Sequence, residues 1–297
     1  MFNSDIDKMA ILAGWGRYPV ILARHLKSKG VHVHCLAIRG HASPELEQIC
    51  DDHVLVSPAR VQPLLKYLRR HKIRIATMAG KVFKTHLFQR WVWLHNIPDL
   101  TFLKYFGRHF FLKAKDNNDD ALLLVAIKLF ADHGVNFLPA TQFLPEILVK
   151  SGTLTKRNIN QSQLGDLKFA WDLARQMGHL DVGQSVAVKN RAVLAVEAVE
   201  GTDECIRRAG QLCPSGGFTV VKVAKPGQDM RFDVPTIGIG TIKTMREAGG
   251  RLLVIEADKT IVLDQVEMVK LADEFGISIV ATNDEAIEAA VQVAKAA

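Results

Sequence analysis

Short apolar strands alternate with amphipathic helices through the first 80 residues, and this alternation constrains the fold more than any other feature. Strands that alternate with helices pair in parallel through right-handed crossovers. The first part of the chain is therefore predicted to be α/β and Rossmann-like. The predicted strands are Met9–Ala13, Val31–Ile38, His53–Ser57 and Ile73–Ala79, and the predicted helices are Pro19–Lys29 and Val61–His71.

The second half is predicted to be another α/β domain, with a mixed sheet. It contains a predicted β-hairpin with Asn190-Arg191 near its turn, followed by strands that alternate with helices. We expect an N-terminal domain at 1–138, a linker region at 139–160 and a C-terminal domain at 161–297. Further predicted elements are helices Asp120–His133, Gln142–Lys150, Gln161–Gln176, Thr241–Ala248 and Gln265–Phe275, an Ala-rich tail helix, and strands Leu252–Glu256 and Ile277–Ala281.

The net charge of +7 arises largely from basic residues between Lys66 and Lys115. Such a field favours nucleic acid, an anionic membrane surface or a phosphorylated substrate. No apolar run approaches the roughly 20 residues of a membrane span, and the N-terminus lacks the basic segment of a signal peptide. We therefore expect a cytoplasmic protein, in which the four cysteines are reduced thiols.

Aromatic and basic residues interleave in Phe83–Phe111. Aromatic bodies beside basic tips suit a membrane interface or an acyl-chain groove, and they also suit stacking on single-stranded nucleic acid. Packing within the core is the third reading, and it suits most of these residues.

The first strand is followed by Gly14-Trp15-Gly16-Arg17. The third glycine of a dinucleotide fingerprint is missing, and the second strand ends in Arg39 rather than in an acidic residue. Two readings stay open: a tight strand-to-helix turn, or an anion site at a helix N-terminus assisted by Arg17.

Charged side chains gather in the segment KPGQDMRFDVP. If the chain is extended, Asp229, Arg231 and Asp233 lie on one side and Met230 and Phe232 on the other. Carboxylates hold hard cations, and Lys225 and Arg231 suit phosphate oxygens. The two aspartates would then lie about 13 Å apart, so one metal ion could contact both only if the chain bends. A solvated edge strand is the alternative.

Other polar residues are weaker candidates. Glu197 is expected to be partly buried, which requires a partner, and Thr202 is the expected N-cap of a helix whose amides could bind an anion. Asp119 and Asp120 suit a helix start or a metal site. His32 and His34 share one face of a strand, and a surface or hydrogen-bonded core pair is favoured over a metal pair because no third ligand lies nearby in sequence.

Several segments, in this order, resemble the LpxI-type UDP-2,3-diacylglucosamine pyrophosphatases of lipid A biosynthesis. They are LAGWGRYP, TMAGKV, DDALLLVAIKLFADHGV, FLPEILVKSGTLT, SVAVKNRAVLAVEAVEGTD and KPGQDMRFDVPTIG. The resemblance implies two α/β domains with substrate between them. It also implies Mg²⁺-dependent hydrolysis to UMP and 2,3-diacylglucosamine 1-phosphate, with water attacking the sugar-side phosphorus, and a homodimer.

Carried onto this sequence, the resemblance makes Asp229 and Asp233 metal ligand and general base, with Lys225 and Arg231 on phosphate. Glu197 is a further metal candidate, followed by Glu200 and Asp203. The residues assigned to substrate binding are Gly14, Gly16, Arg17, Gly80, Lys81, Gln228 and Thr202. Trp15 departs from the family, which usually has a small residue in that turn.

Three functions are compared. The first is the pyrophosphatase, whose lipid substrate implies peripheral contact with the inner membrane. The second is a UDP-sugar or lipid carrier without turnover. The third is a nucleic-acid-binding protein, which is disfavoured because the chain holds no recognised reader motif.

Overall fold

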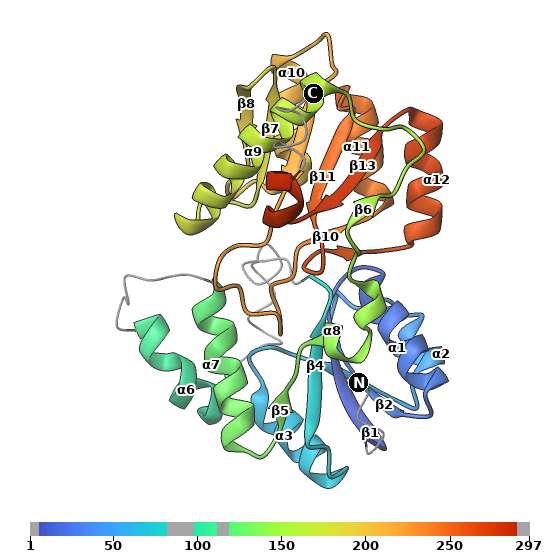
Figure 1. Ribbon diagram of the computed structural model, residues 1–297. Coiled ribbons are helices and arrows are strands. Elements are labelled where there is room, and N and C mark those ends of the chain that lie inside the picture. The colour runs from blue at the N-terminus through green and yellow to red at the C-terminus, as the bar shows by residue number, and fades with distance from the viewer. Residues whose placement is uncertain (1–5, 82–97, 112–118, 290–297) are drawn as a thin grey trace. The chain divides into compact units, whose positions relative to one another are not determined.

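The computed structural model describes residues 6–81, 98–111 and 119–289 (Figure 1). The chain divides into two compact units. The first unit comprises Met1–Pro145 together with Met230–Asp233, and the second comprises Glu146–Asp229 and Val234–Ala297. A short piece of the later chain thus clusters with the N-terminal residues.

The first unit is built on a five-stranded sheet in the order β3-β2-β1-β4-β5, in which every neighbouring pair is parallel. This confirms the Rossmann-like prediction. The strands are β1 (Lys8–Ala13), β2 (His32–Ile38), β3 (Asp52–Val56), β4 (Ile75–Ala79) and β5 (Asn136–Phe137). The helices are α1 (Tyr18–Ser28), α2 (Leu46–Ile49), α3 (Val61–Arg70), α6 (Leu100–Phe111), α7 (Asp119–Asp132) and α8 (Ala140–Phe143).

One apolar core of the first unit lies between its sheet and α3, α6 and α7. Leu64 and Leu68 of α3 pack there with Phe106 of α6 and Phe130 of α7. Of the aromatic segment Phe83–Phe111, residues 83–97 lie outside the described residues, but Phe106 is a core residue and stacks on Phe102. Core packing therefore accounts for these two aromatic side chains.

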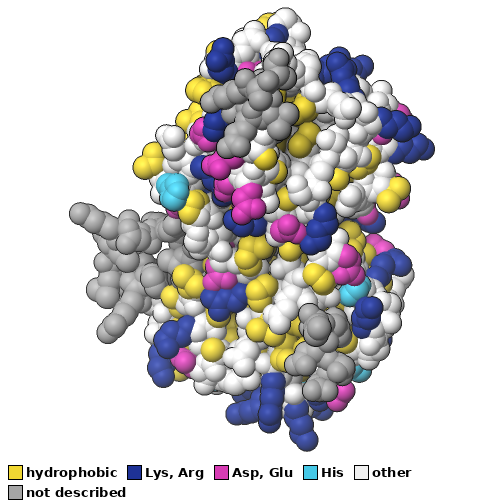
Figure 2. All heavy atoms as spheres, viewed as in Figure 1, with side chains coloured by type: hydrophobic (Ala, Val, Ile, Leu, Met, Phe, Trp, Pro, Cys, Tyr) yellow, Lys and Arg dark blue, Asp and Glu magenta, His cyan; other side chains and the backbone are white. Residues whose placement is uncertain are grey.

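The surface of α3 and the turn after it is basic. Figure 2 shows Lys and Arg side chains gathered at the end of the first unit where Figure 1 draws α3. The exposed cations in this stretch are Lys66, Arg69, Arg70, Lys72 and Arg74.

The second unit contains a six-stranded sheet in the order β6-β13-β11-β9-β7-β8. Its central strands β9, β11 and β13 are parallel, whereas β6, β7 and β8 pair antiparallel, so the predicted mixed sheet is confirmed. The strands are β6 (Gly152–Thr153), β7 (Ser185–Lys189), β8 (Ala192–Val196), β9 (Thr219–Lys222), β11 (Leu252–Glu256) and β13 (Ser278–Thr282). A separate parallel pair is formed by β10 (Thr236–Ile237) and β12 (Ile261–Val262).

Helices cover both faces of this sheet, because successive residues of a strand point to opposite sides. Val220 packs with one core, which includes residues of α10 (Thr202–Leu212), α11 (Ile239–Ala248) and α12 (Gln265–Phe275). Val221 packs with the other core, against α9 (Gln161–His179). The second unit thus has three layers.

Three local predictions were wrong. The expected helix Gln142–Lys150 is replaced by α8 and a 3₁₀ turn, Pro145–Ile147, since a proline disfavours helical backbone in the residue before it. Helix α9 runs past Gly178 rather than ending there. The range 139–160, expected as a linker, holds α8, the 3₁₀ turn and β6.

Candidate functional site

Two glycine-containing turns meet at the carboxyl ends of β1 and β4. Trp15 N–H donates to the Lys81 carbonyl at 2.7 Å, and Lys81 N–H donates back to the Trp15 carbonyl at 2.9 Å. Strand β1 lies between β2 and β4 in the sheet, so this is the point where the strand order reverses. Ligands of open α/β sheets bind outside the carboxyl ends of strands at such a point.

Glycine is required where these turns cross. Gly80 has a φ of +91°, and a Cβ there would lie 2.8 Å from Gly14 C and from Trp15 O. A Cβ on Gly14 would lie 2.6 Å from the Lys81 carbonyl oxygen. The structure therefore brings together Gly14, Gly80 and Lys81, three residues that the sequence assigned to substrate binding.

Helix α1 begins immediately after this crossing. Arg17 is its N-cap residue and makes no side-chain capping bond, and Pro19 lies in its first turn. Arg17 is exposed, and the neighbouring Trp15 is 53% exposed. Backbone N–H groups at a helix start attract anions, so an exposed guanidinium beside them suits phosphate.

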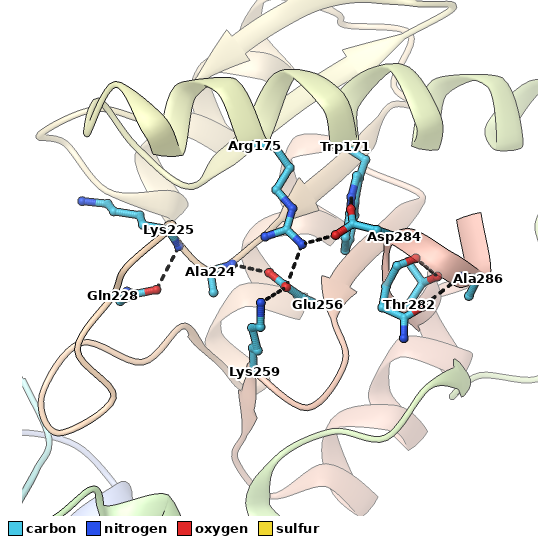
Figure 3. Close-up of polar contacts among 11 residues, drawn as sticks. Trp171, Arg175, Ala224, Lys225, Gln228, Glu256, Lys259, Thr282, Asp284 and Ala286 are labelled. Carbon is cyan, nitrogen blue, oxygen red and sulfur yellow. Dashed lines mark hydrogen bonds and ion pairs between the residues drawn. The ribbon is translucent and has the colours of Figure 1, made fainter. Parts of the chain in front are cut away.

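The segment that carries the predicted catalytic motif is anchored where β9 ends. Ala224 N–H donates to Glu256 Oε2 at 2.8 Å (Figure 3). The other oxygen of Glu256 pairs with Arg175 Nη2 at 2.9 Å and with Lys259 Nζ at 2.8 Å. Glu256 is only 2% exposed, so these two cations and the N–H group compensate the burial of its charge.

A second carboxylate extends this network. Arg175 Nη2 also pairs with Asp284 Oδ2 at 2.8 Å, and Trp171 Nε1 donates to Asp284 Oδ1 at 2.6 Å (Figure 3). Arg175 and Trp171 are one turn apart on α9. Helix α9 is thereby tied to the carboxyl ends of the central strands, next to the motif.

Lys225 and Gln228 enclose a turn that holds Pro226. Lys225 N–H donates to Gln228 Oε1 at 2.9 Å, and Gln228 N–H donates to the Lys225 carbonyl at 3.2 Å. Lys225 Nζ pairs with Asp181 Oδ1 at 2.7 Å. A Cβ on Gly178 would lie 3.2 Å from Pro226 Cδ. Gly178 therefore permits a close approach of α9 to this turn, which explains a glycine that does not end the helix.

The chain bends between the two aspartates of the motif. Residues 230–232 form a turn, and residues 228–234 are all half-buried, without alternation. Phe232 packs against the apolar core of the first unit. The predicted extended strand is therefore wrong, and of the alternatives it left open the structure takes the bend. Asp229 belongs to the second unit and Asp233 to the first.

Glu197 and Thr202 belong to another buried polar cluster. Thr202 Oγ1 donates to Glu197 Oε1 at 2.9 Å, and Lys222 Nζ donates to Thr202 Oγ1 at 2.9 Å. Glu197 and Lys222 are both more than nine-tenths buried. Within the described chain, no hydrogen bond reaches Glu197 Oε2. The predicted N-cap was wrong: Gly201 takes that position on α10, because the Thr202 hydroxyl bonds Glu197.

Lys222 was missed by sequence reasoning. Its place between two valines predicts only that it faces the opposite side of the strand, and that side is buried by packing distant in sequence. The other two second-line acids lie apart from this cluster. Glu200 pairs with Arg208 and accepts from Ala198 N–H, and Asp203 lies in the exposed first turn of α10.

A divalent metal would find its ligands in an incomplete set. Among the described residues, the one cluster of three or more metal-binding side chains is His32, His34 and Asp52, so Asp229, Asp233 and Glu197 do not form a preassembled cage. Mg²⁺ is commonly held by one or two carboxylates together with substrate phosphates. The carboxylates of the motif fit that mode. The side chains of Asp119 and Asp120 lie outside the described residues.

Helices long and apolar enough to cross a lipid bilayer are not found in the part of the chain that the structure describes.

Comparisons with known proteins cover nearly the whole chain. The LpxI N-terminal domain model matches residues 8–147, and the LpxI C-terminal domain model matches residues 150–280. The chain is 30% identical over 285 residues to the UDP-2,3-diacylglucosamine pyrophosphatase LpxI of Caulobacter vibrioides, a match that covers 94% of this chain and 98% of that relative. Two domain matches in order and a full-length relative establish the family, and the chain belongs to the LpxI family.

Proposed function

We propose that this chain is a hydrolase that cleaves the pyrophosphate of UDP-2,3-diacylglucosamine to UMP and 2,3-diacylglucosamine 1-phosphate. The observation that carries the proposal is the full-length match to a relative that bears this activity in its name. The site agrees with it in chemistry, because the motif combines carboxylates with two cationic side chains, and a pyrophosphate requires both charge neutralisation and an activated water.

In the proposed reaction, water attacks the sugar-side phosphorus, the bond from that phosphorus to the bridging oxygen breaks, and UMP leaves with that oxygen. Asp229 and Asp233 divide the roles of metal ligand and general base, and the base takes the proton of the attacking water. A divalent cation such as Mg²⁺, when bound, would screen the pyrophosphate charge and lower the pKa of the water.

Lys225 and Arg231 are proposed to bind phosphate oxygens. Lys225 is paired with Asp181 at 2.7 Å and is only partly exposed. It would exchange this partner for a phosphate oxygen when substrate binds. The Lys225–Gln228 turn fixes the backbone from which both the lysine and Asp229 project. Gly14, Gly16, Arg17, Gly80, Lys81, Gln228 and Thr202 stay our proposed substrate contacts.

The lipid substrate also bears on where the protein works. We propose a cytoplasmic homodimer that contacts the inner membrane peripherally. The exposed cations of α3 and the following turn support this, because basic patches attract anionic lipid surfaces.

The test is UMP release from UDP-2,3-diacylglucosamine with Mg²⁺, for wild type, Asp229→Ala and Asp233→Ala. Loss of a base or metal ligand is expected to lower the rate by about 10²- to 10⁴-fold, and EDTA should abolish it. Asp172→Asn is the matched control, because Asp172 is an exposed residue of α9 that pairs only with Lys168 among the interactions of the described residues. If wild type binds the lipid but releases no UMP, the carrier function replaces the enzyme.

A further inference from the structure

The amino ends of β2 and β3 bring two histidines and an aspartate together. His34 lies opposite Asp52 in the parallel pair, and His32 precedes it on β2. His32 Nε2 lies 2.9 Å from Asp52 Oδ2, and His34 Nδ1 lies 3.2 Å from the same oxygen. One ligand atom from each of the three residues falls within a 4.8 Å span. Three side chains from two strands therefore converge on one point.

A pocket opens beside this cluster. It has a volume of about 340 Å³ and is lined by Asp7, Lys8, His32, His34 and His71. The ring centroids of His34 and His71 are 5.2 Å apart. His71 follows α3 and so comes from a third element. The pocket thus offers three imidazoles, and the cluster beside it adds a carboxylate.

We propose that His32, His34 and Asp52 bind a divalent transition metal of the Zn²⁺ type, with His71 close enough to join them. Imidazole and carboxylate suit Zn²⁺, whereas Mg²⁺ prefers oxygen ligands alone. Two ligands of a tetrahedral Zn²⁺ lie roughly 3.3 Å apart for bond lengths near 2.0–2.1 Å. The observed separations of 2.9 and 3.2 Å come within a few tenths of an ångström of this spacing.

The surroundings of His32 support this role. Asp51 Oδ2 lies 4.0 Å from His32 Nδ1, on the side of the ring away from Asp52. A metal-bound histidine is commonly oriented by a carboxylate at its other nitrogen. Asp51 is itself fixed, because Oδ2 accepts from Val33 N–H at 2.8 Å and Oδ1 pairs with Lys27. The carboxylate that would orient the ring is thus already in position.

Charge in the pocket is compatible with a cation. Lys8 opposes it, but Asp7 lines the same pocket and Asp51 and Asp52 lie at the histidines. One hydrogen bond competes with the metal: Tyr67 Oη lies 2.9 Å from His34 Nδ1. Loss of the Tyr67 hydroxyl should therefore leave metal binding unchanged or tighter, a result that a purely hydrogen-bonded cluster would not give.

The proposed site is separate from the proposed catalytic residues. It lies at the amino ends of the first-unit strands, whereas Gly14 and Gly80 lie at the carboxyl ends. A bound ion would link β2 to β3 and stabilise the first unit, because a ligand that binds only the folded state shifts unfolding by mass action.

The experiment is calorimetric titration of the EDTA-treated, desalted full chain with ZnCl₂, followed by the thermal midpoint with and without Zn²⁺. We expect about one ion per chain and a raised midpoint. His32→Ala and Asp52→Asn should each weaken binding by at least tenfold. Both positions are partly exposed, so these variants should fold, which metal-free circular dichroism checks. Tyr67→Phe should bind at least as tightly as wild type.

Two control variants separate this site from other zinc ligands. His179→Ala removes an exposed histidine elsewhere, and Cys50→Ser removes one of two neighbouring thiols, Cys35 and Cys50. Both should bind like wild type. Cobalt substitution should give the absorption bands of a four-coordinate site and should lose them in His32→Ala. The proposal is overturned if wild type binds no Zn²⁺, if His32→Ala and Asp52→Asn bind like wild type, or if Cys50→Ser abolishes binding.

Discussion

Glu256 accepts a hydrogen bond of 2.8 Å from the backbone N–H of Ala224, the residue immediately before Lys225. Through this contact a buried carboxylate on β11 fixes the point where the motif-bearing segment leaves β9. The same carboxylate neutralises Arg175 and Lys259. Glu256 is therefore expected to position the segment without itself contacting substrate.

Glu256→Gln should lower both stability and activity. The substitution keeps the size of the side chain but removes the charge that two cations share. We expect the free energy of unfolding to fall by about 3 kcal/mol and UMP release to fall at least tenfold, because a small displacement of reacting groups is costly. Urea unfolding and initial rates, measured where both proteins are folded, provide the check. Glu247→Gln, an exposed position on α11, should change neither, and a fully active Glu256→Gln would contradict the positioning role.

Gly80→Ala should be strongly destabilising. The added Cβ would lie 2.8 Å from backbone atoms of two other residues, at a φ that side chains rarely adopt. We expect a loss of at least about 2 kcal/mol in the free energy of unfolding, measured by urea unfolding. Gly240→Ala is the matched control, because Gly240 lies in α11 with no atom within 4 Å of the added Cβ. It should be neutral or stabilising by about 0.5 kcal/mol, and equal effects of the two substitutions would exclude the steric argument.

Local periodicity predicted most elements because it encodes which side of an element is buried. Strand β11 and helix α12 have the bounds predicted for them. Alternation in Asp229–Asp233 misled because a strand also needs a neighbouring strand for pairing, which the pattern does not specify. There, packing of Phe232 on the first-unit core accompanies a bend.

Contacts between distant residues explain what the sequence could not predict in the candidate site. Gly178 suggested a helix end, but it is needed for the approach of Pro226. His32 and His34 were set aside as a metal pair because no third ligand lay nearby in sequence, and parallel pairing of β2 with β3 then placed Asp52 opposite His34. The roles of Asp229 and Asp233 stay predictions.

Asp166→Ala should destabilise the hairpin of β7 and β8. Asn190 and Arg191 form its turn with φ values of 51° and 61°, as in tight two-residue hairpin loops. The buried Asp166 carboxylate of α9 accepts from Asn190 N–H at 3.0 Å and from Arg191 N–H at 2.6 Å. Its loss leaves both donors unsatisfied and should cost about 2–3 kcal/mol, seen as a lower urea midpoint. Asp172→Asn on the same helix is exposed and should change stability by less than about 0.5 kcal/mol; a comparable loss there would contradict the capping role of Asp166.

Asp284 should make stability depend on pH in the acid range. Partial burial acts to raise the pKa of its carboxyl group, but the hydrogen bond from Trp171 and the charge of Arg175 outweigh it, and the pKa lies below its ordinary value. A group whose pKa is depressed by folding stabilises the protein above its unfolded-state pKa, which is about 3.9. That contribution is lost as the pH falls through the lower, folded-state pKa.

Asp284→Asn should therefore lower the urea midpoint near neutral pH, and its difference from wild type should shrink as the pH falls below about 4. The reason is that protonation removes from wild type the charge that the substitution has already removed. Circular dichroism during urea unfolding at a series of pH values measures both curves. Glu285→Gln, at the next and also exposed position, should run parallel to wild type. A difference between Asp284→Asn and wild type that stays constant at all pH values would show that Asp284 stabilises the second unit through packing or neutral hydrogen bonds rather than through its charge.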